Sequence, residues 1–258
     1  MERRCQVTQV NDHIYLLDDN KEATGYLVVG SDKAAVIDTM NGMENLYDIV
    51  RELTDKELIV INTHGHPDHI MGNIFFDKAY MHPADNELAA MFCSDSHFQE
   101  RCEKLGLKMP PFSPMKQGDI FDLGGLTLEV FECPGHTAGS VLLLLREDRM
   151  LFTGDAINHH LWLQLEGCDP LPKVVDTVKS CLFLEDKADY ILHGHAWDKE
   201  HMSLMRAMID GIQEIIDGKT ENDEKYEWFG SDDAVIHVYQ INDGKIYLQD
   251  HHAIVYTP

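Results

Sequence analysis

The stretch ELIVINTHGHPDHIMGN, Glu57 to Asn73, decides the fold, because a short apolar run leads directly into three histidines and an aspartate within six residues. The run ELIVI is typical of a buried strand. Gly65 and Pro67 then prevent the chain from continuing as a regular strand or helix, so alternating side chains can turn inward in a tight loop. Imidazole and carboxylate groups gathered in this way suit zinc, iron or manganese.

The order of the polar residues in this loop indicates two neighbouring ions. His64 and His66 are placed to share one ion, while Asp68 and His69 face a second. The chain has 15 histidines in 258 residues, so a chance occurrence of H-x-H-x-D-H is on the order of one in a few hundred. The sequence therefore predicts a metal site rather than a coincidental cluster.

Three further apolar runs end in the same way, each with a potential metal ligand just beyond it. LTLEVFECPG precedes His136, RMLFTG precedes Asp155, and YILHG precedes His195. In an α/β protein the loops at strand ends collect functional groups on a rigid base. We therefore expect these side chains to gather with those of the first motif.

These four segments together make the chain resemble the metallo-β-lactamase-fold hydrolase superfamily. The H-x-H-x-D-H motif is complete, and CPGHTAGSVLLLL (133–145), LFTGDAI (151–157) and LHGH (192–195) resemble the later ligand segments of the family in the right order. The resemblance implies an α/β fold, a four-layer αβ/βα sandwich, and a dinuclear metal site. It implies two divalent ions, zinc first, with iron or manganese as alternatives.

Carried over residue by residue, the resemblance implies seven metal ligands. They are His64, His66 and His136 for the first ion, Asp68, His69 and His195 for the second, and Asp155 as the bridge. The segment ILHGHAW offers two candidates for the last histidine. The ligand of the family usually follows the glycine, which favours His195 and leaves His193 in a supporting position.

The resemblance also implies a mechanism. Two cations a few ångström apart lower the pKa of a bridging water, and the resulting hydroxide attacks a carbonyl carbon. Asp68 is expected to act as the catalytic residue that orients the water or moves its proton. A bridging Asp155 is usual in glyoxalase II-like thioesterases and lactonases but not in the β-lactamases themselves. This favours hydrolysis of a thioester or lactone, and makes the chain closer to glyoxalase II-like and lactonase-like members than to true β-lactamases.

Two other classes of protein remain alternatives. An iron-dependent persulfide dioxygenase would use much the same ligands on the same fold, as would the diiron half of a flavodiiron protein. The flavodiiron version normally has an acidic residue at the position of His66 and an attached flavodoxin domain, and this chain shows neither. A metal-binding protein without catalysis is the third possibility, which the intact ligand set with Asp68 disfavours.

The segment NHHLWLQLEGCDPLP after Asp155 is the candidate substrate wall. Trp162 offers an apolar surface, and the polar groups expected to contact substrate are His159, His160 and Gln164. Packing of Trp162 in the core is an equally good interpretation of that residue. The segment has no basic cluster that could bind the carboxylates of glutathione.

Composition limits the partners. The formal charge of −24 argues against nucleic acid and anionic membranes, which are bound through clustered lysine and arginine. The start of the chain is polar where a secretory signal would be apolar, and no apolar run is long enough for a membrane span. We expect a cytoplasmic protein with a small-molecule substrate, reduced cysteines, Cys181 in the core, and a possible homo-oligomer.

The pattern of elements predicts one domain over 1–258. Strands joined by a Gly-Ser-Asp turn begin the chain, a β-α-β unit leads to the histidine motif, and a helix opens at Pro83. Residues 93–118 combine charges, prolines and turn signals, which predicts an excursion from the core with one short helix. More strands and two amphipathic helices follow, and the chain ends in a β-hairpin that turns at 242–244.

Overall fold

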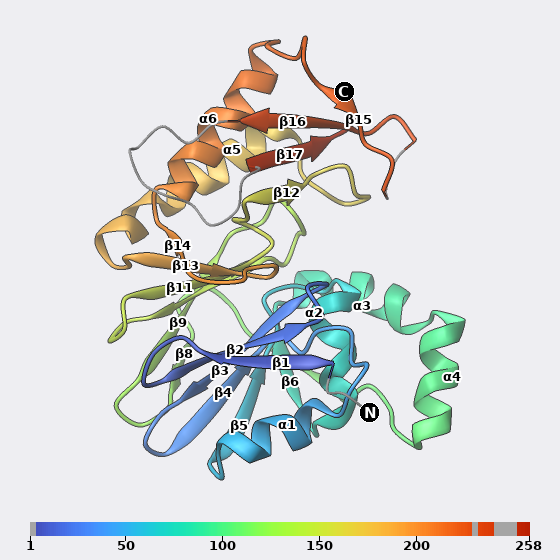
Figure 1. Cartoon of the computed structure of the whole chain (residues 1–258), viewed down its shortest axis with the longest axis vertical. Helices are drawn as coiled ribbons and strands as arrows, with labels where there is room; N and C mark the ends of the chain where they lie inside the picture. Colours follow the sequence, from blue (N-terminus) through green and yellow to red (C-terminus); the bar gives the residue numbers. More distant parts are fainter. Residues whose placement is uncertain (1–3, 229–231, 240–251) are drawn as a thin grey trace.

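Two sheets packed face to face form the centre of the molecule (Figure 1). The computed structural model describes residues 4–228, 232–239 and 252–258. The apolar layer between the sheets contains buried side chains from both, among them Ile14, Val28, Val130 and Phe152. Burial of such apolar surface is the main force that holds the sheets together.

The first sheet has seven strands in sequence order. These are β1 (Cys5–Gln9), β2 (Ile14–Asp19), β3 (Thr24–Val29), β4 (Lys33–Ile37), β5 (Glu57–Ile61), β6 (Ala79–Met81) and β7 (Phe112–Pro114). β1 to β4 are antiparallel, whereas β4 to β7 are parallel. The predicted Gly-Ser-Asp turn and the β-α-β unit that delivers the chain to the histidine motif are both confirmed.

The second sheet has six strands in the order β14-β13-β11-β10-β9-β8. Their bounds are β8 (Ile120–Asp122), β9 (Thr127–Glu132), β10 (Val141–Leu145), β11 (Met150–Gly154), β13 (Tyr190–His193) and β14 (Glu200–His201). β10 is antiparallel to both β9 and β11, and β11 is parallel to β13. β9, β11 and β13 therefore run in one direction, and their carboxyl ends meet at one edge of the sheet.

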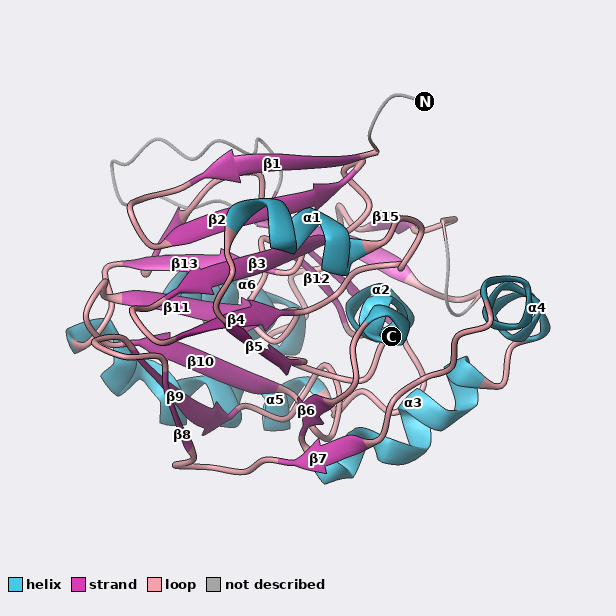
Figure 2. Cartoon of the chain, turned by 90° about the horizontal axis from the view of Figure 1, so that it is seen from below, coloured by secondary structure: helices cyan, strands magenta, loops and turns pink. Residues whose placement is uncertain are grey.

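Helices cover the outer face of each sheet, so the predicted four-layer αβ/βα sandwich is confirmed (Figures 1 and 2). On the first sheet, α1 (Leu46–Leu53) buries Leu46, Ile49 and Val50, which lie on one face of the helix. On the second sheet lie α5 (Leu171–Cys181) and α6 (Leu204–Ile216), with the 3₁₀ turn η3 (Leu182–Asp186) after α5. The 3₁₀ turn η1 (Met71–Phe75) follows the histidine motif.

The segment predicted as an excursion is only partly one. η2 (Pro83–Asp85) leads into α3 (Asn86–Cys93), and α4 (Ser96–Leu105) is the single helix expected within 93–118. The chain then returns, because β7 pairs with β6 and forms the edge of the first sheet. Proline is tolerated in an edge strand, and Phe112 packs against the apolar clusters on that side of the sheet. The prolines around Phe112 hid this strand in the sequence.

The closing strands belong to a third, smaller sheet in the order β12-β17-β16-β15. Its strands are β12 (His160–Trp162), β15 (Glu224–Lys225), β16 (Val235–Tyr239) and β17 (His252–Tyr256). β16 and β17 are antiparallel, as predicted, while the expected turn at 242–244 lies outside the described residues. Pairing of β12 with β17 was not expected. This pairing ties the segment after Asp155 to the end of the chain.

The cysteines agree with the expectation of reduced thiols and of a buried Cys181. All six cysteines are free thiols, and Cys181, the last residue of α5, is buried in the core. Among the described residues, no helix combines the length and the apolar character that crossing a membrane requires.

Candidate metal centre

The residues predicted as metal ligands lie at neighbouring ends of the central strands. They are His64 and His66 after β5, Asp68 and His69 in the short helix α2 (Pro67–Ile70), His136 after β9, Asp155 after β11, and His195 after β13. Pro67 at the first position of α2 fixes the backbone angle with which this helix begins. All seven side chains come together in three overlapping groups of potential ligands. Two of them lie side by side, and the third, His64, His69 and Asp155, shares one residue with each.

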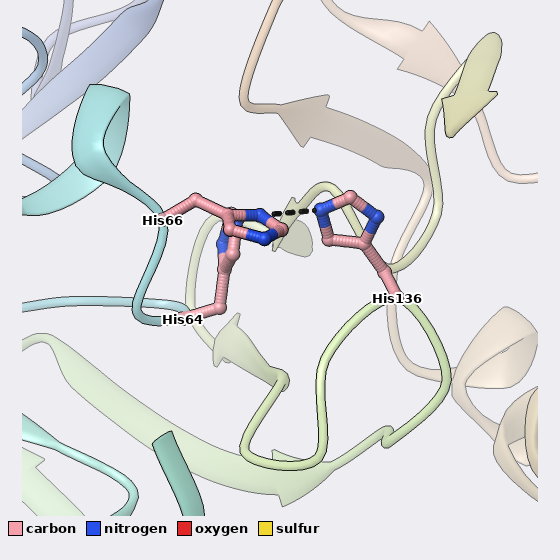
Figure 3. Close-up of side chains that lie close together, drawn as sticks. All are labelled: His64, His66 and His136. Atoms are coloured by element: carbon pink, nitrogen blue, oxygen red, sulfur yellow. Dashed lines mark hydrogen bonds between the residues drawn. The ribbon is translucent and has the colours of Figure 1, made fainter. Parts of the chain in front are cut away.

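Three buried histidines make up the first group: His64, His66 and His136. Figure 3 shows the first two on one loop and His136 facing them from another. His66 Nδ1 lies 2.9 Å from His136 Nε2 and 3.1 Å from His64 Nε2. Ring nitrogens that converge so closely can present their lone pairs to one metal ion.

A mixed group of carboxylate and imidazole lies beside the first. Asp68 Oδ2 is 3.6 Å from His69 Nε2 and 3.6 Å from His195 Nε2. Asp155 lies between the two groups, since its Oδ2 is 3.1 Å from His195 Nε2 and 3.8 Å from His136 Nε2. This is the position that a bridging carboxylate would need.

Hydrogen bonds on the far side of the rings fix which nitrogen faces the centre. His69 Nδ1 lies 2.8 Å from Asp38 Oδ2, and His136 Nδ1 lies 2.8 Å from the carbonyl oxygen of Trp162. Because a carboxylate and a carbonyl only accept, the neutral form of each ring carries its hydrogen on Nδ1 and leaves the lone pair of Nε2 for a cation. His69 Nε2 is buried and has no hydrogen-bond partner in the described part of the chain. A metal ion would satisfy this nitrogen, so the donor set fits one.

The electrostatics of the site favour a bound cation. Burial lowers the pKa of all three histidines of the first group, which keeps them in the neutral form that coordinates metals. Burial would also lower the pKa of His69, but neighbouring carboxylates, Asp68 foremost, raise it well above its usual value. For Asp155, burial is outweighed by His195 and His69, which hold the pKa well below its usual range. The carboxylate therefore remains charged.

Asp38, at the end of β4, positions the ligands and was not predicted. Its carboxylate accepts from the backbone N–H of Thr63 at 2.7 Å and the hydroxyl of Thr63 at 2.7 Å, in addition to His69. Its backbone has a positive φ of 56°, a strained conformation for a residue other than glycine. The signal was present in the sequence, because Asp38 directly follows the apolar run AAVI, as the ligands follow theirs.

Asp85 connects two ligand loops and was also missed. Its buried carboxylate accepts from the backbone N–H of Gly65 at 2.8 Å, the hydroxyl of Thr137 at 2.7 Å, and the backbone N–H of Gly139 at 2.6 Å. The first donor belongs to the loop of His66 and the other two to the loop that follows His136. In the sequence, HPADNE indicates only a helix start, so nothing marked Asp85 as a bridge between loops.

His193 lies beside the centre rather than in its ligand groups. It is fully buried, its carbonyl oxygen accepts from the hydroxyl of Tyr26 at 2.6 Å, and its Nε2 lies 3.2 Å from His159 Nδ1. Gly194 passes so close to the centre that a Cβ there would lie 2.4 Å from Asp155 Oδ1. Only glycine permits this approach, so the chain reaches His195 with no side chain in between.

Two cavities meet at the centre. The first, of about 180 Å³, reaches both ligand groups and is bounded by Trp162 and by apolar side chains of α3. The second, of about 590 Å³, reaches Asp68 and His195 and is more polar. Of the predicted substrate contacts, His159, His160 and Trp162 line the second cavity. Gln164 is buried and lines neither cavity.

Imidazoles and carboxylates clustered at strand ends of an αβ/βα sandwich define a metalloenzyme. Comparison with known proteins gives its family: residues 21–195 match the model described as the metallo-beta-lactamase superfamily. The chain belongs to this superfamily, and the resemblance inferred from its motifs is confirmed. The family and its named relatives also give the class of activity: the chain is a metal-dependent hydrolase.

Curated relatives share this class. The acyl-coenzyme A thioesterase MBLAC2 of Gallus gallus is 30% identical over 211 residues, which cover 69% of this chain and 74% of that protein. The hydroxyacylglutathione hydrolase GloC of Haemophilus influenzae is 28% identical over 130 residues, which cover 48% of this chain and 61% of that protein. Both names describe hydrolases of thioesters.

Solved structures share the fold. A metallo-beta-lactamase from Pontibacter korlensis superimposes with a TM-score of 0.63 at 19% identity, covering 81% of this chain and 99% of that chain. The sec-alkylsulfatase Pisa1 from Pseudomonas sp. gives a TM-score of 0.67 at 14% identity, covering 83% of this chain and 42% of that chain. Proteins of different activity on one fold show that the substrate has to be argued from the site.

Proposed function

We propose that the protein is a dinuclear metal-dependent hydrolase of acyl thioesters, with lactones as the second ester class. The observation that carries the proposal is Asp155, whose charged carboxylate lies between the two ligand groups, with Oδ2 within 3.8 Å of His136 Nε2 and 3.1 Å of His195 Nε2. The activities for which the two relatives are named support the choice of thioesters.

The ligand sets predicted from the sequence are the ones we propose. The first ion would be held by His64, His66 and His136, and the second by Asp68, His69 and His195. Nitrogen and oxygen donors of this kind suit zinc, and they also suit iron and manganese. His66 would coordinate through Nδ1, because this is the nitrogen that faces the other two histidines.

Two divalent ions, when bound, would lower the pKa of a water molecule between them and polarise the carbonyl of the ester. Asp68 contributes from the protein side. It has 28% of its side chain exposed, and its Oδ2 points toward both His69 and His195 while lining both cavities. In this position Asp68 can take up the proton of the attacking water. The oxygen of the water would bond to the acyl carbon as the C–S bond breaks, and Asp68 would pass the proton to the departing sulfur, so that the products are a carboxylic acid and a thiol.

The test combines metal analysis with a substrate screen. Purified protein reconstituted with zinc should hydrolyse at least one thioester or lactone in a panel that also contains β-lactams and phosphodiesters. Asp68→Ala should lose nearly all of this activity, since both the second ion and the proton acceptor are affected. Asp77→Ala is the matched control, because Asp77 is an exposed aspartate nine residues further along the chain.

Two results would overturn the proposal. Equal rates of hydrolysis for wild type and Asp68→Ala would show that this centre does not catalyse the reaction. Iron in the purified protein, with oxygen uptake on a persulfide, would instead identify a dioxygenase on the same ligands.

A further inference from the structure

Helix α3 presents an apolar face to the metal centre instead of to a core. Leu88, Met91 and Phe92 are spaced i, i+3 and i+4, so they share one side of the helix. All three line the first cavity, whereas Ala89 is the buried residue of this helix. Met91 remains 54% exposed, although such a stripe usually packs into a core.

The opposite wall of this cavity is aromatic and fixed in place. Trp162 Nε1–H donates to the hydroxyl of Tyr226 at 2.8 Å, which holds the indole in one orientation. The ring of Trp162 lies 5.0 Å from that of His195, and the ring of Phe92 lies 5.8 Å from that of His66. The apolar walls therefore begin directly at the side chains that surround the metal centre.

Away from the metal centre, Glu166 is the one charged side chain among the described residues that line the cavity, and it disfavours an anionic occupant. Among the described residues that line it, the charged ones other than histidines are all acidic: Asp68, Asp155 and Glu166. An acyl group with a carboxylate of its own would meet repulsion there, while a hydrocarbon chain would meet Leu88, Phe92 and Trp162. The neighbouring polar cavity, which also contains Asp68 and His195, leaves room for the thiol half of a thioester.

We propose that the cavity between α3 and Trp162 binds the apolar acyl chain of the thioester substrate, with Leu88 and Met91 as determinants of chain length. The inference rests on the proposed function and adds the substrate class to it. The reacting carbonyl would then lie between the two ligand groups, at the inner end of the cavity, and longer chains would extend outward past Met91.

The first experiment measures chain-length selectivity on an uncharged leaving group. Acetyl, butanoyl, hexanoyl and octanoyl thioesters of N-acetylcysteamine are compared with the zinc-loaded protein. Each added methylene should raise kcat/KM by about fourfold until the chain leaves the cavity, as expected for burial of one CH₂ group. Rates that do not change with chain length would overturn the proposal.

Variants locate the selectivity on α3. In the double variant Leu88→Gln with Met91→Gln, the ratio of octanoyl to acetyl kcat/KM should fall at least tenfold, because glutamine has similar length and helix propensity but a polar end. Ala90→Gln places the same side chain at an exposed position that does not line the cavity, and it should keep the wild-type ratio. An unchanged ratio in the double variant would contradict the assignment to α3.

Binding separates this inference from the proposed function. The affinities of straight-chain carboxylates from butanoate to decanoate can be followed through tryptophan fluorescence, since Trp162 and Trp228 line the cavity. If no thioester is hydrolysed but affinity still rises with chain length, the proposed function fails and the apolar site stands. If thioesters are hydrolysed while neither rate nor affinity depends on chain length, the function stands and the acyl site fails.

Discussion

Replacing Asp85 by asparagine should weaken the metal centre without removing any of its proposed ligands. The carboxylate of Asp85 is 1% exposed and accepts three hydrogen bonds from two different loops. Its Oδ2 accepts from Gly65 N and Thr137 Oγ1, while its Oδ1 accepts from Gly139 N. An asparagine keeps one oxygen and replaces the other with an NH₂ group. Whichever way the amide is turned, one backbone N–H then faces a donor.

The magnitude follows from that mismatch. A buried N–H without an acceptor costs about 1–3 kcal/mol, and a hydrogen bond to a charged group is worth about 1.5–3 kcal/mol. The hydroxyl of Thr137 can rotate and limit its own loss. We expect the variant to lose about 2–4 kcal/mol of unfolding free energy. Metal affinity should fall about 10–100-fold, as it does when groups that orient ligands are removed.

The assay measures both quantities on the same preparations. Urea unfolding of the metal-free protein gives the stability, and competition with a chromophoric chelator gives the zinc affinity. The control is Asp95→Asn, because Asp95 caps α4 by accepting from His97 N and Phe98 N, and asparagine is an equally good cap. If Asp85→Asn matched the control in stability and zinc affinity, the connection between the two loops would have no energetic role.

Three further predictions concern pH, metal and leaving group. Burial raises the pKa of Glu200 to about 7, whereas the carboxyl of the unfolded chain loses its proton near pH 4.5. The free energy of unfolding therefore falls as the pH rises from about 4.5 to about 7. Glu200→Gln should therefore be more stable than wild type by about 1–2 kcal/mol at pH 8 but not at pH 4, as checked by urea unfolding. Zinc at about one hundred times its Kd should raise the unfolding free energy by about 2.7 kcal/mol; calorimetry of chelator-treated protein without such a rise would argue against the centre. Lys21 is the one lysine or arginine among the described residues lining the polar cavity, so this cavity offers little to bind the phosphates of coenzyme A. Octanoyl thioesters of coenzyme A and N-acetylcysteamine should therefore differ in kcat/KM by less than about tenfold. A much larger preference for coenzyme A in parallel rate measurements would mean that a phosphate site lies elsewhere.

The metal centre could be predicted from the sequence because its requirements are local. Each ligand is a specific residue type placed just beyond an apolar run, and such runs are recognisable as strands. His136 and His195 therefore stood out although they are far from His64 along the chain, and the structure brings them together. Asp38 obeyed the same rule and was overlooked, since a single aspartate after a strand is common at turns.

Elements that depend on tertiary pairing could not be predicted in this way. The edge strand at 112–114 follows two prolines and contains a third, and it is a strand only because β6 offers a partner. The segment 160–162 was interpreted as part of the substrate wall and not as a strand, and it pairs with β17 almost a hundred residues later. Neither pairing leaves a local signature, because a strand of three residues is too short to show a period.

The part of the proposed substrate wall that α3 contributes was missed for a related reason, whereas Trp162 on the opposite side was predicted. Leu88 and Phe92 have the spacing of an ordinary buried helix face, and the sequence alone gives no means of telling a core from an open cavity. The difference depends on what lies opposite: for α3 it is Trp162, oriented by Tyr226 across the cavity. The residues that we propose to hold the metal are therefore fixed by chemistry and visible in the sequence. The residues that we propose to select the acyl chain are fixed only by packing, so we expect that they can change without disturbing the centre.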